Sequence, residues 1–115
     1  MATKTETVRN LEWLLSESNG YRSRKTMTFA QTGAEVLSGT VVGKVTASGK
    51  LKAYANANSD GTETAVGILM ETLPAATGDV SVTIIELDAE VFDAMLTGID
   101  AAGRTDLLAL GIKMR

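Results

Sequence analysis

Residues 40–54 read TVVGKVTASGKLKAY, and this stretch decides the kind of fold that the chain adopts. Its first half, 40–46, is rich in β-branched residues, which favour an extended strand. The triplet 47–49 (Ala-Ser-Gly) is typical of a tight reversal. After it, lysines alternate with apolar residues over 50–54, so one face of that strand is expected to be wet. The stretch therefore predicts a β-hairpin.

The strand pattern continues on both sides of the hairpin. Residues 26–30 alternate polar and apolar side chains, as a half-buried strand does. Residues 56–61 form a polar loop, and 64–70 then predict a buried strand in which Gly67 marks a bulge or a close backbone approach. A turn is expected at 77–79, and 80–84 alternate again in another strand.

The last third of the chain changes character. Residues 88–96 predict a strand that passes into a short helical turn and stops at Gly98. Asp100 is expected to cap a helix that ends at Gly111, and 112–115 return as a final strand. We therefore expect a β-rich α+β fold: a small, compact β-barrel-like or β-tulip domain with a short C-terminal helix.

Length and composition limit both the organisation and the chemistry. A chain of 115 residues with 44% hydrophobic residues fits one domain, which we place at 26–115, preceded by an extended N-terminal arm at 1–25. Cysteine and histidine are absent from the sequence. Thiol nucleophiles, Ser-His-Asp hydrolysis and zinc fingers are therefore excluded. We expect a binding protein, not an enzyme, with no cofactor and no metal.

The first 26 residues differ from the rest in charge. They carry a net charge of +2, whereas the remainder carries −5, within a total of −3. Leucines at 11, 14 and 15 suit a helix, but 11, 13 and 15 suit a strand equally well, and 16–20 break either element. A basic run follows at 21–25. We interpret this leader as an arm that a partner orders, with an ordinary edge hairpin as the alternative.

Other motifs favour plainer interpretations. The run 39–44 (Gly-Thr-Val-Val-Gly-Lys) has three residues between its glycines and Val45 after its lysine, so it fails as a phosphate-binding loop. The acidic residues 86, 88 and 90 would share one face of an extended strand, which we interpret as a solvated face and not as a cation site. Lys44 and Lys50 lack the surroundings of a biotin- or lipoate-carrying lysine.

Nucleic acid and membranes are not expected as partners. The basic cluster Arg22, Arg24 and Lys25 sits in an acidic chain without a recognition helix, so contact with an acidic protein patch is the better interpretation. No apolar run approaches the length of a membrane span, and the first ten residues lack the apolar core of a signal peptide. We expect synthesis in the cytoplasm.

Several segments, in order, resemble one known family. The segments 12–24 (EWLLSESNGYRSR), 37–50 (LSGTVVGKVTASGK), 60–69 (DGTETAVGIL) and 108–115 (LALGIKMR) are similar to the leader, hairpin, strand and C-terminal end of lambda-type bacteriophage head decoration proteins. Each motif alone is weak, whereas their ordered combination is fairly specific. The connection between 92 and 106 is only loosely similar.

The resemblance implies a capsid-stabilising protein that binds the phage major capsid protein as a homotrimer, at threefold and quasi-threefold sites on the outer surface of the expanded head. On this basis the arm would add a strand to a sheet edge of the coat protein. Apolar and polar anchors would be Leu11, Trp13, Leu14, Leu15, Tyr21, Arg22 and Arg24. Burial of Trp13 in its own domain is the alternative for that residue. The alternative function is a non-viral oligomeric module that docks through the same arm.

Overall fold

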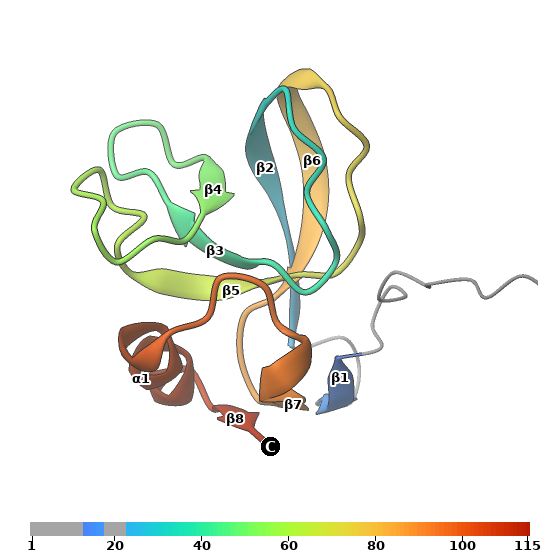
Figure 1. Cartoon of the computed structure of the whole chain (residues 1–115), viewed down its shortest axis with the longest axis vertical. Helices are drawn as coiled ribbons and strands as arrows, with labels where there is room; N and C mark the ends of the chain where they lie inside the picture. The colour runs from blue at the N-terminus through green and yellow to red at the C-terminus, as the bar shows by residue number, and fades with distance from the viewer. Residues whose placement is uncertain (1–12, 18–22) are drawn as a thin grey trace, which may run out of the picture.

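The computed structural model describes residues 13–17 and 23–115, which form a barrel, a small sheet and one helix (Figure 1). The strands are β1 (Leu14–Glu17), β2 (Arg24–Thr32), β3 (Val41–Lys44), β4 (Leu51–Ala53), β5 (Ala65–Leu69), β6 (Thr77–Ile85), β7 (Ala89–Val91) and β8 (Ile112–Met114). A 3-10 turn, η2, spans Asp93–Met95, and the helix α1 spans Ala101–Ala109. The expected β-rich α+β class with a barrel and a short C-terminal helix is confirmed.

Five strands close the barrel in the order β2-β4-β3-β5-β6. The antiparallel pair β2–β6 is its longest ladder, running from Arg24–Ile85 to Thr32–Thr77. The hairpin predicted from 40–54 is present as the antiparallel pair β3–β4. Closure depends on one parallel pair, Phe29 with Leu51. Apolar side chains of both strands fill the interior, because Phe29 and Leu51 belong to the same buried cluster.

Two glycines allow backbones to approach inside the barrel. A Cβ at Gly67 would lie 2.7 Å from the carbonyl oxygen of Ile85, so the close approach predicted there is confirmed. A Cβ at Gly43 would lie 2.5 Å from the Cα of Thr62, which places the loop between β4 and β5 directly against β3. The pairing of β3 with β5 is irregular beside both glycines.

The second sheet has the order β1-β7-β8 and lies at one end of the barrel together with α1 (Figure 1). Strand β1 is antiparallel to β7, and β8 is parallel to it. Asp100 caps α1, since its side chain accepts from the backbone N–H of Gly103 at 2.7 Å, as predicted. One buried cluster joins this sheet, α1 and the barrel, and it includes Val91, Leu107 and Ile68.

Two local expectations differ from the structure. Residues 77–79 extend β6 instead of turning, because β2 continues to Thr32 and offers them backbone partners. The acidic residues 86, 88 and 90 do not share a strand face, because Asp88 has a φ of 47° and breaks the extended chain between β6 and β7. The ambiguity over the leader is resolved for residues 14–17, which form a strand.

Candidate interaction surface around the N-terminal strand

Strand β1 is an outer strand of the three-stranded sheet. It pairs with β7 on one side, with Leu14 opposite Val91 and Glu17 opposite Ala89. The register shifts between Leu14 and Ser16, and Leu15 lies at this irregularity with 46% of its surface exposed. Within the described residues the other edge of β1 is unpaired, so its backbone N–H and C=O groups are available to an added strand.

Trp13 precedes β1 and is fully buried. Its indole Nε1–H donates to the hydroxyl oxygen of Ser38 at 2.9 Å, and that hydroxyl donates to the carbonyl oxygen of Met70 at 2.8 Å. Gly39 leaves room for the ring, because a Cβ there would lie 2.9 Å from Trp13 Cδ1. The structure therefore places Trp13 in the core of its own domain, and its side chain offers no surface to a partner in this conformation.

Arg24 lies at the start of β2 and is engaged with Glu17 at the end of β1. Its Nε lies 2.9 Å from Oε2 of Glu17 and its terminal nitrogen lies 2.6 Å from Oε1, a bidentate pair. The hydrogen bond from Arg24 holds the pKa of Glu17 below its ordinary value. About a quarter of each side chain is exposed, 27% for Arg24 and 22% for Glu17. The pair fixes the end of β1 to the barrel.

The remaining anchors expected from the sequence fall into two groups. Leu14 is half-buried and packs on the core cluster that contains Trp13, whereas Leu15 faces outward. Leu11, Tyr21 and Arg22 lie outside the described residues. The structure thus brings Trp13, Leu14 and Leu15 to one edge of the sheet.

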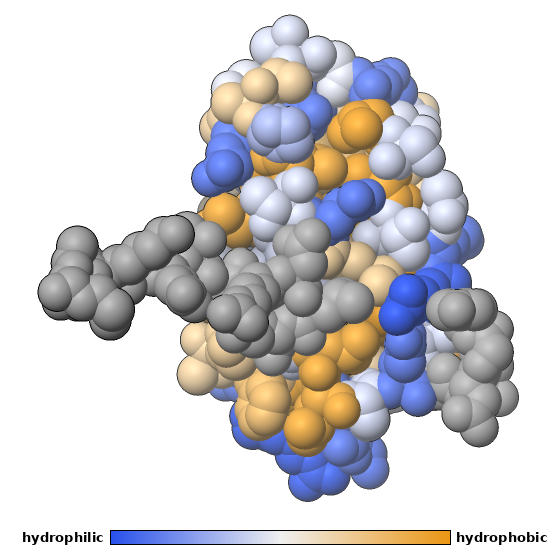
Figure 2. Space-filling model, turned by 90° about the vertical axis from the view of Figure 1, so that its right-hand side faces the viewer, coloured by the Kyte–Doolittle hydropathy of each residue, from blue (hydrophilic) through white to orange (hydrophobic). Residues whose placement is uncertain are grey.

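Two residues that the sequence analysis missed contribute to this region. Ser38 holds the indole of Trp13, and no local pattern signals a contact across 25 positions. Phe92 follows β7 and is 40% exposed, and its backbone N–H donates to the carbonyl oxygen of Trp13 at 2.7 Å. For Phe92, the available signal was the scarcity of aromatic residues in this chain, because an exposed aromatic residue is unusual when there are so few. Figure 2 shows the β1 side of the molecule, where apolar surface lies beside charged surface.

Most of the acidic residues around β7 are neutralised by basic neighbours. A terminal guanidinium nitrogen of Arg115 lies 2.9 Å from Oε1 of Glu90, and Nε of Arg104 lies 3.0 Å from Oδ1 of Asp93. Nζ of Lys25 lies 3.9 Å from Oε2 of Glu86. Within residues 13–17 and 23–115, no group of three acidic residues is arranged to hold a metal ion. No helix in this part of the chain is long and apolar enough to cross a membrane.

Within the described residues, the small sheet has an unpaired outer strand and an exposed apolar side chain at Leu15, a surface suited to contact with another protein chain. The family model for the bacteriophage lambda head decoration protein D matches residues 3–112 of the 115. The chain belongs to this family of phage head decoration proteins, and the resemblance inferred from its motifs is confirmed. A search of curated proteins found no significant match. The family is one of structural capsid proteins, which assigns the chain to the capsid of a phage particle.

Proposed function

We propose that this chain is a cement protein that binds the expanded phage head as a trimer, at threefold and quasi-threefold sites, and stabilises the shell against the pressure of packaged DNA. The observation that carries the proposal is the family match over residues 3–112, which includes the leader as well as the barrel. The chain is made in the host cytoplasm and reaches the outer surface of the head during maturation.

The physical basis of cementing is interface area. Internal DNA pushes the subunits of the shell apart. A trimer that bridges several capsomers adds contacts that have to be lost before those subunits separate. Ordering of a binding segment costs conformational entropy, so binding to a shell that presents only part of the site is weak. Binding therefore follows expansion.

The segment 1–25 is the main coat-protein contact in this proposal. Burial of Trp13 and the ion pair between Arg24 and Glu17 support it, because they fix β1 firmly to the barrel and thus transmit load from the segment to the domain. Leu15 and the unpaired edge of β1 offer an apolar contact and backbone groups for strand addition. Leu11, Tyr21 and Arg22 are the further contacts. Trp13 and Leu14 hold the segment in place from inside the domain.

Deletion of residues 2–12 tests the proposal. The cut ends before Trp13, so β1 and the buried indole are retained, whereas deletion to residue 25 would remove both. We expect the full-length protein to sediment with expanded, DNA-free heads and not with unexpanded ones. The truncated protein should lose at least about tenfold in affinity for expanded heads. Leu15→Ser, in the full-length chain, should weaken binding in the same assay.

The control for the deletion is the thermal unfolding of the truncated protein, which shows whether the domain remains folded. Cryo-microscopy of decorated heads locates the protein. Density at threefold positions supports the proposal, whereas unchanged binding by both the truncated protein and Leu15→Ser contradicts the role of the segment. A full-length protein that ignores expanded heads contradicts the function as a whole.

A further inference from the structure

The charged groups of Arg24 and Glu17 face each other, and most of both side chains is covered. Nε and a terminal nitrogen of the guanidinium lie 2.9 and 2.6 Å from the two carboxylate oxygens. Only 27% of the Arg24 side chain and 22% of the Glu17 side chain are exposed. A bidentate pair of this kind is both strong and directional. To bind a coat protein directly, either charge would have to give up a partner in its own domain.

Arg24 projects from a rigid base. It begins β2 opposite Ile85, which is fully buried. Ser23, just before it, is also fully buried. The Ser23 hydroxyl donates to the carbonyl oxygen of Asp88 at 2.8 Å, and its carbonyl oxygen accepts from the backbone N–H of Glu86 at 2.7 Å. The backbone at Arg24 is therefore fixed both to the barrel and to the connection between β6 and β7.

Glu17 is the last residue of β1, so Arg24 holds that end of the strand. The other end is held at Trp13, whose indole is buried and whose carbonyl oxygen accepts from the backbone N–H of Phe92 at 2.7 Å. Between these ends the ladder with β7 consists of three residue pairs, with a shift of register beside Leu15. So short a ladder does little to fix a strand by itself. The position of β1 therefore depends on the contacts at its two ends.

These contacts assign a role to Arg24. We infer that Arg24 is a positioning residue, which acts through Glu17 to hold β1 in the conformation that the coat protein binds, and that neither charge touches the coat protein. This inference rests on the proposed function and deepens it. The physical gain is preorganisation, because a strand that is already fixed loses less conformational entropy when another strand is added to its edge.

A double-substitution cycle in the full-length protein tests the inference. Arg24→Ala and Glu17→Ala should each weaken binding to expanded, DNA-free heads at least about fivefold, because each releases the same end of β1. The protein that carries both substitutions should bind within about twofold of either single variant, because the second substitution removes a group whose partner is already lost. Two independent coat contacts would instead give losses that multiply.

Amide hydrogen exchange separates positioning from a general loss of stability. In all three variants, exchange over residues 14–17 should become faster, whereas exchange in the ladder between β2 and β6 should stay as in the unchanged protein.

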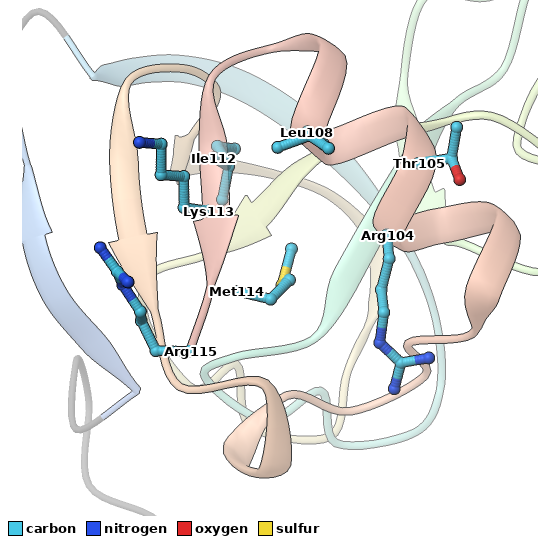
Figure 3. A pocket seen from close by; sticks show the side chains of 7 residues that line it. All are labelled: Arg104, Thr105, Leu108, Ile112, Lys113, Met114 and Arg115. Atoms are coloured by element: carbon cyan, nitrogen blue, oxygen red, sulfur yellow. The ribbon is translucent and has the colours of Figure 1, made fainter.

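Arg104→Ala is the matched control. It also removes one arginine and breaks an arginine–carboxylate pair, with Asp93, but Arg104 lies on α1, where it lines an apolar groove between α1 and β8 (Figure 3). This variant should bind heads within about twofold of the unchanged protein, with unchanged exchange over 14–17.

The outcomes are distinct. Equal weakening by the single and combined substitutions, with faster exchange confined to β1, supports the inference. Single variants that lose less than about fivefold overturn it. So does a further loss beyond about twofold when Arg24→Ala is added to Glu17→Ala, because Arg24 then contacts the coat protein itself. Faster exchange throughout the barrel overturns it as well, since the pair then acts on global stability. Failure of the unchanged protein to bind heads rejects the proposed function itself.

Discussion

At the scale of single residues, the indole of Trp13 is one of the contacts that join the N-terminal strand to the barrel, together with the ion pair between Arg24 and Glu17. Its Nε1–H, the hydroxyl of Ser38 and the carbonyl oxygen of Met70 form a buried chain of hydrogen bonds with distances of 2.9 and 2.8 Å. Within the described residues, no buried side-chain nitrogen or oxygen lacks a partner. Such a chain is costly to interrupt, because a buried donor or acceptor without a partner loses its hydration and gains nothing in return.

Ser38→Ala should therefore destabilise the protein. The substitution leaves the indole N–H of Trp13 and the carbonyl oxygen of Met70 without the hydroxyl, and we expect the free energy of unfolding to fall by about 2 kcal/mol. Urea denaturation followed by the fluorescence of Trp13 measures the change. Ser81→Ala, at an exposed position of β6, is the control and should change stability little. Equal midpoints for the two variants would contradict this account.

Tyr54 is a second residue whose environment has a measurable consequence. Burial, then the hydrogen bond to Asp100 at 2.7 Å, raises the pKa of the Tyr54 phenol from 10.0 to about 12. The fold thus favours the neutral phenol. The contribution of the neutral Tyr54 phenol to the free energy of unfolding is complete below pH 10.0, and it is lost as the pH rises from there through about 12.

Titration of tyrosinate absorbance in a Tyr21→Phe variant isolates Tyr54 and should give a midpoint at about 12 while the protein is folded. Asp100→Asn removes the neighbouring negative charge, so it should move that midpoint toward the ordinary value. A midpoint near the ordinary value in the folded Tyr21→Phe protein is the result that would reject a buried, hydrogen-bonded phenol.

At the scale of elements, the loop between β4 and β5 is held against β3 by the absence of a side chain at Gly43. The carbonyl oxygen and Cα of Thr62 would lie 2.7 and 2.5 Å from a Cβ at that position. The loop is also closed by the backbone N–H of Ala55, which donates to the carbonyl oxygen of Thr62 at 3.2 Å. The position of the loop on this side of the barrel therefore depends on Gly43, and also on Gly61, where a Cβ would collide with the carbonyl oxygen of Lys44.

Gly43→Ala should displace that loop and lower the free energy of unfolding by roughly 1–3 kcal/mol, the usual cost of overpacking. The specific measurement is amide hydrogen exchange at Ala55, which should become faster. Gly78→Ala is the control, since a Cβ there meets nothing within 4 Å, although its φ of +102° adds strain. Faster exchange at Ala55 in both variants would mean that global stability, and not the contact with Thr62, controls the loop.

At the scale of the whole molecule, one core holds the barrel and the small sheet together. The buried cluster that contains Trp13 includes Val41 and Ile68 from the barrel, Val91 from the small sheet and Leu107 from α1. Because these parts share apolar side chains, we expect them to unfold in one transition. We therefore expect the cooperatively folded domain to begin at Trp13, within the segment 1–25 that the sequence suggested as a separate arm.

A pair of truncations tests this boundary. Removal of residues 2–12 should leave the free energy of unfolding nearly unchanged, whereas removal of 2–17 also removes the Trp13 indole and β1 and should cost about 3–5 kcal/mol. Urea denaturation measures both. If the two truncated proteins are equally stable, the residues up to 17 are separable from the domain, and the core does not depend on Trp13.

The elements that the sequence predicted are those governed by local rules. The hairpin over 40–54, the helix capped by Asp100 and ended before Gly111, and the close approach at Gly67 all follow from β-branched residues, a capping carboxylate and glycines within a short window. The β-rich fold class followed from the same signals. The expected turn at 77–79 failed because pairing with β2, far away in the chain, extended β6.

The sequence by itself determined the β3–β4 hairpin, the helix and, through its ordered motifs, the family, whereas it left β1 ambiguous and predicted a turn where β6 begins. Only the tertiary structure decided that Trp13 faces inward, that Arg24 pairs with Glu17, and that α1 and β8 enclose a groove with an apolar lining. The physical reason is the range of the interactions. Capping, turn formation and alternation act within a few residues, whereas the contact of Trp13 with Ser38 spans 25 positions and exists only when the core assembles.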